Sequence, residues 1–345
     1  MRYVFALLIF ATATAGCGGT ASMQATDPGG GGILASGGEG NVTVPGGAPE
    51  TALAAGTVEA VRLPGTPVDF NVVYVPGGEA MIGTPDASLR ESDEPAPTPV
   101  QISPFWIAQT EVTFEEYAVF RYPEQDTDST AAGLPFDVDA VARPSPPYED
   151  PSGGMSRAGY PATGMTQWGA LHYARWLSEK TGTFYRLPTE AEWEHACRLG
   201  GERDLARAAW YLDNSGEEFH PVGSAAPDAL GLYDMLGNVS EWMLDEYRAD
   251  YGAVLAEQPE DPWVQPTALH PRTVRGGAFD DPIELMRCGD RLESTMSWKR
   301  RDPQIPKSFW WNTDSPFLGF RLVRPVVQPT PDEAAAFWAI VLGDG

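Results

Sequence analysis

A sharp turn followed by a capped helix lies near the middle of the chain, between Tyr185 and Arg198. Pro188 ends the preceding segment, and Thr189 with Glu192 three residues later forms a capping box. Glu190, Glu192 and Glu194 lie near the positive end of the helix dipole. Helical spacing places four residues on one face toward the core: Ala191, Trp193, Ala196 and Cys197. This segment alone predicts a helix start and no function.

Short strand signals separated by long loops surround this helix. Strands are expected at Val68–Val75, Ala80–Ile82 and Val100–Ile107. Further helices are expected after the caps Thr113 and Thr166, the second ending at Gly182, and at Asp332–Leu342. Such a mixture is typical of an α+β domain rather than a βαβ array. The polar stretch 122–159 is either a functional loop or, more simply, a tolerated surface insertion.

The N-terminus has the pattern of an export signal. Arg2 precedes an apolar run, Tyr3 to Ala15, which is too short to span a membrane. Thr14-Ala15-Gly16-Cys17 resembles a bacterial lipobox, so residues 1–17 are expected to be a lipoprotein signal peptide with lipidation at Cys17. Ordinary secretion is the alternative. Residues 18–65, rich in Gly and Ala, are expected to be a disordered tether.

The chain is strongly acidic, with a formal net charge of −25 over 345 residues. This charge argues against nucleic-acid binding, because phosphate contacts need Lys and Arg. The simplest interpretation is that the negative charge keeps the protein soluble. A more specific interpretation is that the acidic side chains bind divalent cations. With only three Cys, the chain is not a disulfide-dense scaffold.

Several blocks in a fixed order resemble the formylglycine-generating enzyme family, also called sulfatase-modifying factor. The blocks are Val75–Gly78, Met81–Gly83, Glu111–Thr113, Tyr185–Arg198, Gly231–Trp242, Val274–Phe279 and Gly319–Val323. The resemblance implies a C-type-lectin-like α+β fold with little regular secondary structure. The domain is expected at residues 66–325, followed by a C-terminal tail at 326–345.

The chemistry of the family's oxidase depends on a pair of cysteines. In that family two Cys, separated by four residues, follow an Arg-Gly-Gly-Ser element and hold Cu(I), because soft thiolates suit that ion. Here the matching stretch, Arg275 to Met286, contains no Cys, and Ala278 replaces the Ser. Copper is therefore not expected, no catalytic residue is assigned, and the chain is expected not to be the oxidase. Transfer of the family activity, formylglycine generation on a sulfatase Cys, is kept as the alternative.

The resemblance also implies a disulfide between Cys197 and Cys288, because some family members join these two positions. Such a bridge would close a loop of about 90 residues and stabilise the fold by about 4–5 kcal/mol in the chain-entropy model. Two buried free thiols, or a reactive Cys288, are the alternatives.

The turn at residues 236–242 is the candidate metal site. Asn238 and Glu241 offer side-chain oxygens and Gly237 and Val239 offer carbonyls, and hard oxygen ligands in a turn suit Ca²⁺. The resemblance points to calcium here. Spacing alone favours a turn in which Asn238 bonds its own backbone.

Aromatic and basic residues concentrate at 298–302 and 309–311. They predict either a packed loop with Arg–aromatic stacking or a lip that docks a ligand or peptide. A possible ligand cleft is assigned to Arg275, Trp242, Arg287, Arg291, Trp298 and Trp310.

Together these observations predict a membrane-tethered binding or structural module of the cell envelope. It would be lipid-anchored outside the cytoplasm, at the periplasmic face or the outer membrane. Its partner would be an unidentified envelope protein or peptide. A carbohydrate-binding protein is a further alternative, suggested only by the lectin-like fold.

Overall fold

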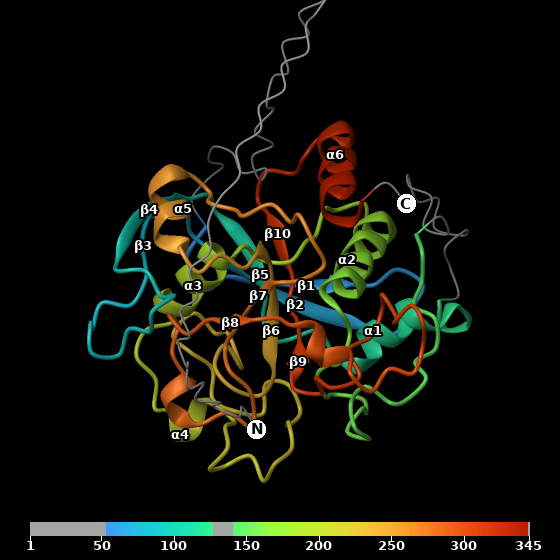
Figure 1. Ribbon diagram of the computed structural model, residues 1–345. Coiled ribbons are helices and arrows are strands. Elements are labelled where there is room, and N and C mark those ends of the chain that lie inside the picture. Colours follow the sequence, from blue (N-terminus) through green and yellow to red (C-terminus); the bar gives the residue numbers. More distant parts are fainter. Residues whose placement is uncertain (1–52, 127–140, 344–345) are drawn as a thin grey trace, which may run out of the picture. The chain divides into compact units, whose positions relative to one another are not determined.

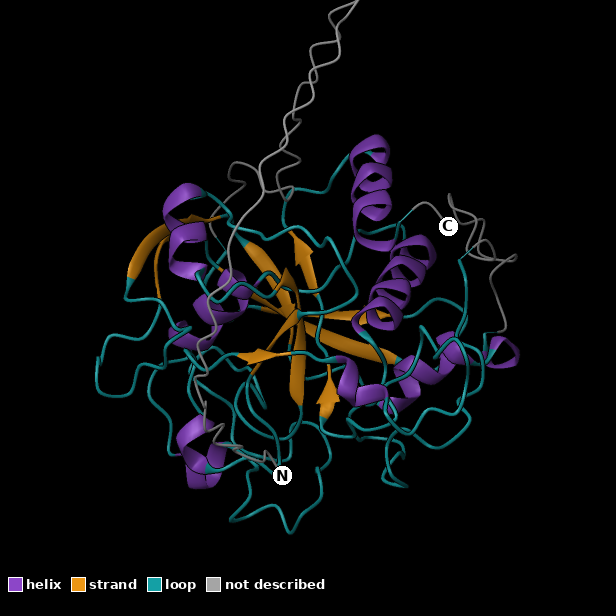
Figure 2. Ribbon diagram, viewed as in Figure 1, coloured by secondary structure: helices purple, strands orange, loops and turns teal. Residues whose placement is uncertain are grey.

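Two four-stranded sheets and a two-stranded sheet form the centre of the fold, with the helices around them (Figures 1 and 2). The computed structural model describes residues 53–126 and 141–343, which belong to one compact unit, Thr43–Gly345. The predicted α+β class is confirmed, with short strands and long connecting loops.

The first sheet has the order β1-β2-β5-β10, and every neighbouring pair is antiparallel. Its strands are β1 (Val58–Arg62), β2 (Asp69–Val75), β5 (Phe105–Ala108) and β10 (Val323–Pro325). The last strand therefore returns to the beginning of the domain and pairs with β5. Within the stretch 18–65 predicted as a tether, Val58–Arg62 is instead an edge strand that pairs with β2 along its whole length, whereas residues 18–52 lie outside the described residues. Its side chains are mostly exposed, so no buried alternation marked it in the sequence.

The second sheet has the order β8-β7-β6-β9, in which only the β6–β9 pair is parallel. Its strands are β6 (Ser240–Glu246), β7 (Arg272–Arg275), β8 (Leu292–Glu293) and β9 (Leu318–Gly319). Two of the family-like blocks thus become neighbouring strands, β6 and β7, and a third supplies β9.

The expected single strand at Val100–Ile107 is wrong. It is two strands in different sheets, because β4 (Thr98–Ile102) pairs with β3 (Gly78–Ile82), whereas β5 belongs to the first sheet. The chain turns at Ser103, whose backbone N–H and hydroxyl both donate to the Asp261 carboxylate, at 2.7 and 2.8 Å. Pro104 follows and cannot donate to a ladder, which ends the pairing there.

The capped helices form where the sequence predicts them. They are α1 (Phe114–Arg121), α2 (Gln167–Thr181), α3 (Glu190–Leu199) and α6 (Pro331–Leu342), with the shorter α4 (Leu205–Ala208) and α5 (Tyr251–Glu257). Three-residue and four-residue 3₁₀ turns lie at Pro123–Gln125, Ile283–Leu285 and Met296–Lys299. Thr113 and Thr189 close full capping boxes, and Gly182 ends α2 in the left-handed conformation at φ 66°.

Two apolar clusters make up most of the core. One joins α1, α2 and α6 to β6 and β9, and includes the fully buried Trp176 and Trp242. The other joins α3 to strands β2 to β5 and includes Trp193 and Cys197. Figure 1 shows α6 beside α2, and α3 and α5 beside β3 and β4. Among the described residues, no helix combines the length and apolar character that crossing a membrane requires.

Candidate functional site

Arg275 ends β7 and lies wholly inside the protein. Its Nη2 forms ion pairs with Glu194, at 2.7 Å, and Glu190, at 3.0 Å. Its Nη1 donates to the backbone carbonyls of Cys288 and Asp290, at 2.9 and 3.0 Å. The helix α3 is thereby fastened to β7 and to the loop that follows it, so Arg275 serves the packing of the core.

Arg291 completes this network from the other side of Glu190. It forms an ion pair with the Glu190 carboxylate, and its guanidinium lies 4.8 Å from the ring centres of Tyr247 and Tyr251. Burial alone would raise the pKa of Glu190, but the positive charges of Arg291 and Arg275 outweigh it and hold that pKa below its usual value. Glu190 is therefore ionised inside the protein and balanced by the two arginines.

Three of the six residues expected to line a ligand cleft lie inside the protein, and the other three make separate contacts. Arg275, Arg291 and Trp242 are buried, and the Trp242 indole N–H donates to the Met165 carbonyl at 3.1 Å. The remaining three are spread over separate contacts: Arg287 pairs with Glu94, Trp298 packs on Trp242 and Phe317, and Trp310 packs on Trp168 and His172. The charges of Arg275 and Arg291 are balanced by acids on α3, and the ligand cleft stays a prediction.

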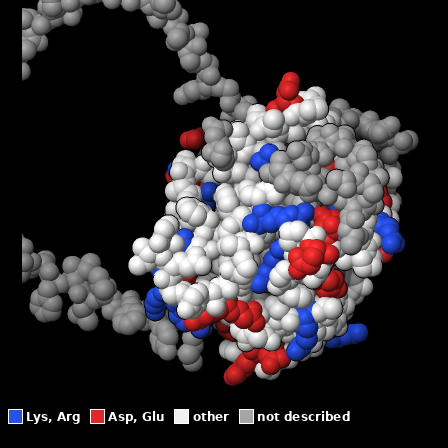
Figure 3. Space-filling view, turned by 90° about the vertical axis from the view of Figure 1, so that its right-hand side faces the viewer, with Lys and Arg blue, Asp and Glu red and all other residues white. Residues whose placement is uncertain are grey.

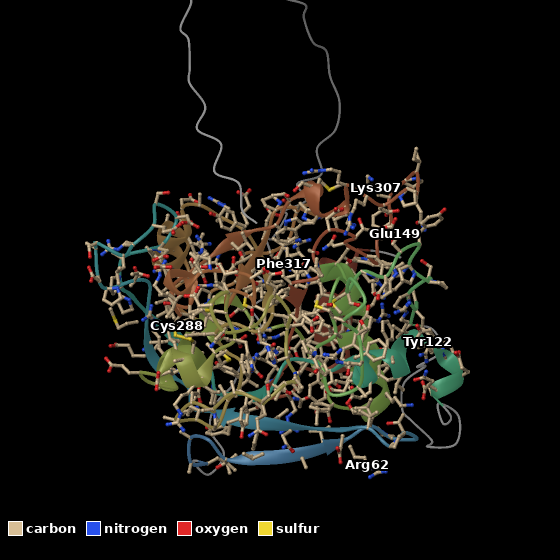
Figure 4. The ribbon with its side chains drawn as sticks, turned by 90° about the horizontal axis from the view of Figure 1, so that it is seen from below. Arg62, Tyr122, Glu149, Cys288, Lys307 and Phe317 are labelled. Carbon is tan, nitrogen blue, oxygen red and sulfur yellow. A yellow bond between two sulfur atoms is a disulfide. The ribbon has the colours of Figure 1, made fainter. Side chains whose placement is uncertain are left out.

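Cys197 of α3 and Cys288 form a disulfide across 91 positions of sequence, as the sequence predicts. Cys288 is labelled in Figure 4. Arg203 lies beside the bridge, with its Nη1 3.3 Å from the sulfur of Cys197, and pairs with Asp228 at 2.9 Å. The bridge holds the segment after β7 against α3, and neither cysteine is a free thiol.

The turn expected to bind calcium forms, but its side chains already have protein partners. The Glu241 carboxylate accepts two hydrogen bonds from Arg321 at 2.8 Å and one from the Trp193 indole at 2.9 Å. Asn238, at φ 57°, accepts from the His220 backbone N–H at 2.8 Å and donates to Glu111 at 3.0 Å. The side chains of Asn238 and Glu241 therefore do not fit as ligands in this arrangement.

Two further buried acids lie next to this turn. Burial raises the pKa of Glu111 well above its usual value, with the Asp234 charge adding to the effect, and burial raises the pKa of Asp234 to about 6. The two carboxyl groups are hydrogen-bonded to each other. Over that same part of the chain, no group of three or more His, Cys, Asp or Glu is arranged to hold a metal ion.

The segment matching the family's copper pair packs as ordinary core. Ala278 and Phe279 join a small apolar cluster with Phe219 and Val239. Asp281 accepts a hydrogen bond from the Ala278 backbone N–H at 3.1 Å, and Met286 is buried. This segment therefore offers no thiolate, and its Asp281 carboxylate and Met286 thioether belong to the packing.

The aromatic and basic segment after β8 is packed only in part, since Phe309 is 56% exposed. Lys299 and Trp311 are buried, and Arg301 pairs with Asp314 at 2.8 Å. In Figure 4, Phe317 lies among packed side chains, whereas Lys307 lies at the rim of the molecule. On the face shown in Figure 3, basic side chains lie next to acidic ones and form no continuous basic surface.

The sequence pattern alone does not indicate that the acids of α3 form buried ion pairs. Glu190 and Glu194 were expected to interact with the dipole of α3, but both are buried partners of Arg275. Their i, i+4 spacing on the face that carries Ala191 was the available signal. Glu111 and Asp234 come from distant loops, and no local pattern indicates that they meet.

The fold is thus an α+β domain whose charged interior is tied together by arginine–carboxylate pairs and one disulfide. Residues 65–326 match the family described as FGE-sulfatase, the sulfatase-modifying factor enzyme 1-like domain. Because this match covers most of the chain, the protein belongs to that family.

Relatives with quite different names share this domain. The chain is 35% identical over 143 residues to the serine/threonine-protein kinase pkn1 of Chlamydia pneumoniae, covering 39% of this chain and 21% of that protein. It covers 37% of the related Pkn1 of Chlamydia trachomatis, so it spans about a fifth to a third of the length of these relatives. It is 29% identical over 257 residues to the formylglycine-generating enzyme of Thermomonospora curvata, covering 60% of this chain and 82% of that enzyme.

A solved structure has the same fold. The chain superposes on PvdO from Pseudomonas aeruginosa with a TM-score of 0.58 and 26% identity, covering 80% of this chain and all of that one. The predicted fold class is therefore confirmed by the family match and by this structure together.

Proposed function

We propose that this protein is a non-catalytic binding or structural module of its family, held at the cell envelope by a lipid on Cys17. The observation that carries the proposal is the absence of a thiolate pair. The chain has three Cys, of which Cys197 and Cys288 are joined to each other. Cys17, which lies outside the described residues, would be the only thiol left, and two thiolates are needed to hold Cu(I) in the way the family's oxidase does.

The relatives support a module rather than a complete enzyme. In the two Pkn1 kinases the matched region is a minor part of a much longer protein, so a domain of this family occurs beside another activity. The binding partner proposed for this chain is an envelope protein or peptide. The Thermomonospora enzyme supports the alternative, formylglycine generation, over a larger share of its own length.

An experiment on copper binding and thiols distinguishes the non-catalytic module from the formylglycine-generating oxidase. The purified mature chain is denatured and its thiols are counted with and without reductant, and the folded chain is titrated with Cu(I) and incubated with O₂ and a Cys-containing peptide. The Thermomonospora enzyme is the positive control. We expect Cys197 and Cys288 to react only after reduction, no tight copper and no peptide aldehyde. Stoichiometric Cu(I) binding with conversion of the peptide would overturn the proposal.

Calcium binding near Asn238 stays a prediction of the sequence. An ion there would have to displace the contacts of Glu241 with Arg321, or the hydrogen bond between the carboxyl groups of Glu111 and Asp234. Thermal unfolding of the chain with calcium and with a chelator tests this prediction. The variant Asp234→Asn should lose any stabilisation by calcium if the ion is bound through Glu111 and Asp234. Equal unfolding midpoints in both conditions would contradict calcium binding.

The membrane anchor is tested separately. Metabolic labelling with a fatty acid, followed by mass analysis of the mature N-terminus, compares the natural chain with Cys17→Ser. We expect label only on the natural chain. Label on neither would leave ordinary secretion as the alternative.

A further inference from the structure

A pocket lies where the end of α2 meets the segment that leads into α6. Its volume is about 270 Å³. One wall comes from the last turns of α2 and the residues after it: Arg175, Ser178, Glu179, Gly182, Thr183 and Phe184. The opposite wall comes from Gln328, Pro329, Pro331, Ala334, Ala335 and Trp338. That wall lies beyond residue 326, where the family match ends. In Figure 1, α2 and α6 lie side by side.

Internal hydrogen bonds hold the pocket walls in place without a ligand. The Phe184 backbone N–H donates to the Gln328 side chain, which itself donates to the Pro325 carbonyl, both at 2.6 Å. The Ser178 hydroxyl donates to the Ala174 carbonyl at 2.7 Å and accepts from the Tyr185 N–H at 2.8 Å. These polar groups are therefore already paired, and a preformed pocket loses little ordering entropy on binding.

The remaining lining determines the apolar part of the ligand. Phe184 and Trp338 are in ring contact at 5.4 Å, and prolines and alanines complete the surface. A cavity of about 150 Å³ holds benzene, so this pocket has room for roughly two rings or a medium-length aliphatic chain. An apolar body of that size is what the walls can desolvate.

Arg175 determines the charged part. Its side chain is 38% exposed, and its ion pair, from Nε to Glu179, is long at 4.0 Å. Nε itself is buried and has no hydrogen-bond partner among the described residues. A partly exposed guanidinium at the edge of an apolar pocket is suited to a carboxylate, which accepts charge-assisted hydrogen bonds from it.

We propose that the pocket between α2 and α6 binds a compact amphiphilic carboxylic acid, with the apolar body against Trp338 and Phe184 and the carboxylate on Arg175. This binding does not depend on the function proposed above. The ligand is identified by its chemistry, an apolar body of about two rings that carries one acidic group.

Calorimetric titration of the full chain with three matched probes tests the proposal. The probes are 2-naphthoate, the neutral 2-naphthalenemethanol and the cationic 2-naphthylmethylamine. We expect 2-naphthoate to bind with a Kd in about the millimolar range or below, and at least about ten-fold more tightly than the neutral probe. The amine is expected to bind most weakly.

Two pairs of variants localise the binding. Ala335 lines the pocket and Ala336 does not, although both are exposed on α6. Ala335→Trp should fill the pocket and abolish binding, whereas Ala336→Trp should leave it unchanged. Arg175→Gln should weaken 2-naphthoate about ten-fold without affecting the neutral probe, and Arg207→Gln on α4 should change neither. Thermal unfolding midpoints equal to that of the natural chain show that each variant is folded.

The proposal is overturned by any of three results. The first is that none of the probes binds at millimolar concentration. The second is undiminished binding by Ala335→Trp, which would place the probe elsewhere. The third is evidence against recognition of the carboxylate by Arg175. Such evidence would be an affinity for the amine equal to or above that for 2-naphthoate, or normal binding of 2-naphthoate by Arg175→Gln.

Discussion

Glu116 is a buried acid that has no basic partner within residues 53–126 and 141–343. It is the third residue of α1, and its carboxylate accepts hydrogen bonds from the backbone N–H and the hydroxyl of Thr113, at 3.2 and 3.0 Å. Burial raises the pKa of Glu116 to about 8, although the Thr113 hydrogen bonds oppose the rise. In contrast, Glu190 is balanced by Arg291 and Arg275 and stays ionised.

Stability should therefore depend on pH through Glu116. Between about pH 4.5 and 8 the folded chain keeps a proton that the unfolded chain loses, so this residue's contribution to stability falls as pH rises. Glu116→Gln keeps an acceptor for Thr113 and stays neutral. We expect it to be more stable than the natural chain at pH 8, by on the order of 1–3 kcal/mol, and similar at pH 5. Urea unfolding at several pH values measures this difference.

Glu333 is a matched control whose pKa is shifted in the opposite direction. It holds the same position in the capping box of α6, but it is exposed, and hydrogen bonds from Thr330 lower its pKa. Glu333→Gln should therefore give no gain at pH 8. A loss of stability at pH 8 in Glu116→Gln would contradict the argument.

The disulfide gives a second prediction at this scale. Replacing both Cys197 and Cys288 by Ala removes a link across 91 positions, which should cost about 4–5 kcal/mol in the chain-entropy model. Urea unfolding of the oxidised natural chain, the reduced natural chain and the double variant measures the cost. Reduction should reproduce most of it, since the same link is lost. A natural chain that is equally stable with and without reductant would show that the surrounding ion pairs suffice.

At the scale of elements, α3 contributes to two buried networks. Its Glu190 and Glu194 pair with Arg275, and its Trp193 donates to Glu241. Its cap combines Thr189 with Glu192, and the Glu192 carboxylate also binds Arg186 at 2.7 and 2.8 Å. We expect Thr189→Ala to destabilise the whole domain by about 1–2 kcal/mol, because the helix start carries Glu190. Thr330→Ala removes the same type of cap from α6, whose first turn is exposed, and should cost less. Urea unfolding of both variants compares them, and equal losses would contradict the difference in burial.

How far sequence could predict an element depended on whether its signal is local. Thr113, Thr166 and Thr189 mark helix starts through bonds within one turn, and all three helices begin there. Strand β1 and the break at Ser103 depend instead on partners far along the chain, β2 and Asp261. For the same reason the sequence does not indicate that Arg275 and Arg291 meet acids on α3, which only the folded chain reveals.

At the scale of the whole molecule, the segment beyond the family domain is part of its core. Phe337, Trp338 and Val341 of α6 are buried in the cluster that contains α2 and β6. The ring of Phe337 lies 5.2 Å from Phe184 and 5.7 Å from Trp263. The expected C-terminal tail is thus a packed helix that covers aromatic side chains of the domain.

Removing this helix should destabilise the domain as a unit. Phe337→Ala should cost about 3–5 kcal/mol, the usual loss for emptying a buried aromatic position. Ala336→Ser, on the exposed side of the same helix, should cost less than about 0.5 kcal/mol. A chain ending at residue 326 would expose Trp263 and Phe184 together, so we expect it to bind a hydrophobic dye and unfold at lower urea concentration. If that shortened chain instead unfolds cooperatively at the midpoint of the natural one, α6 is an independent attachment, and its packing against α2 adds nothing to the stability of the fold.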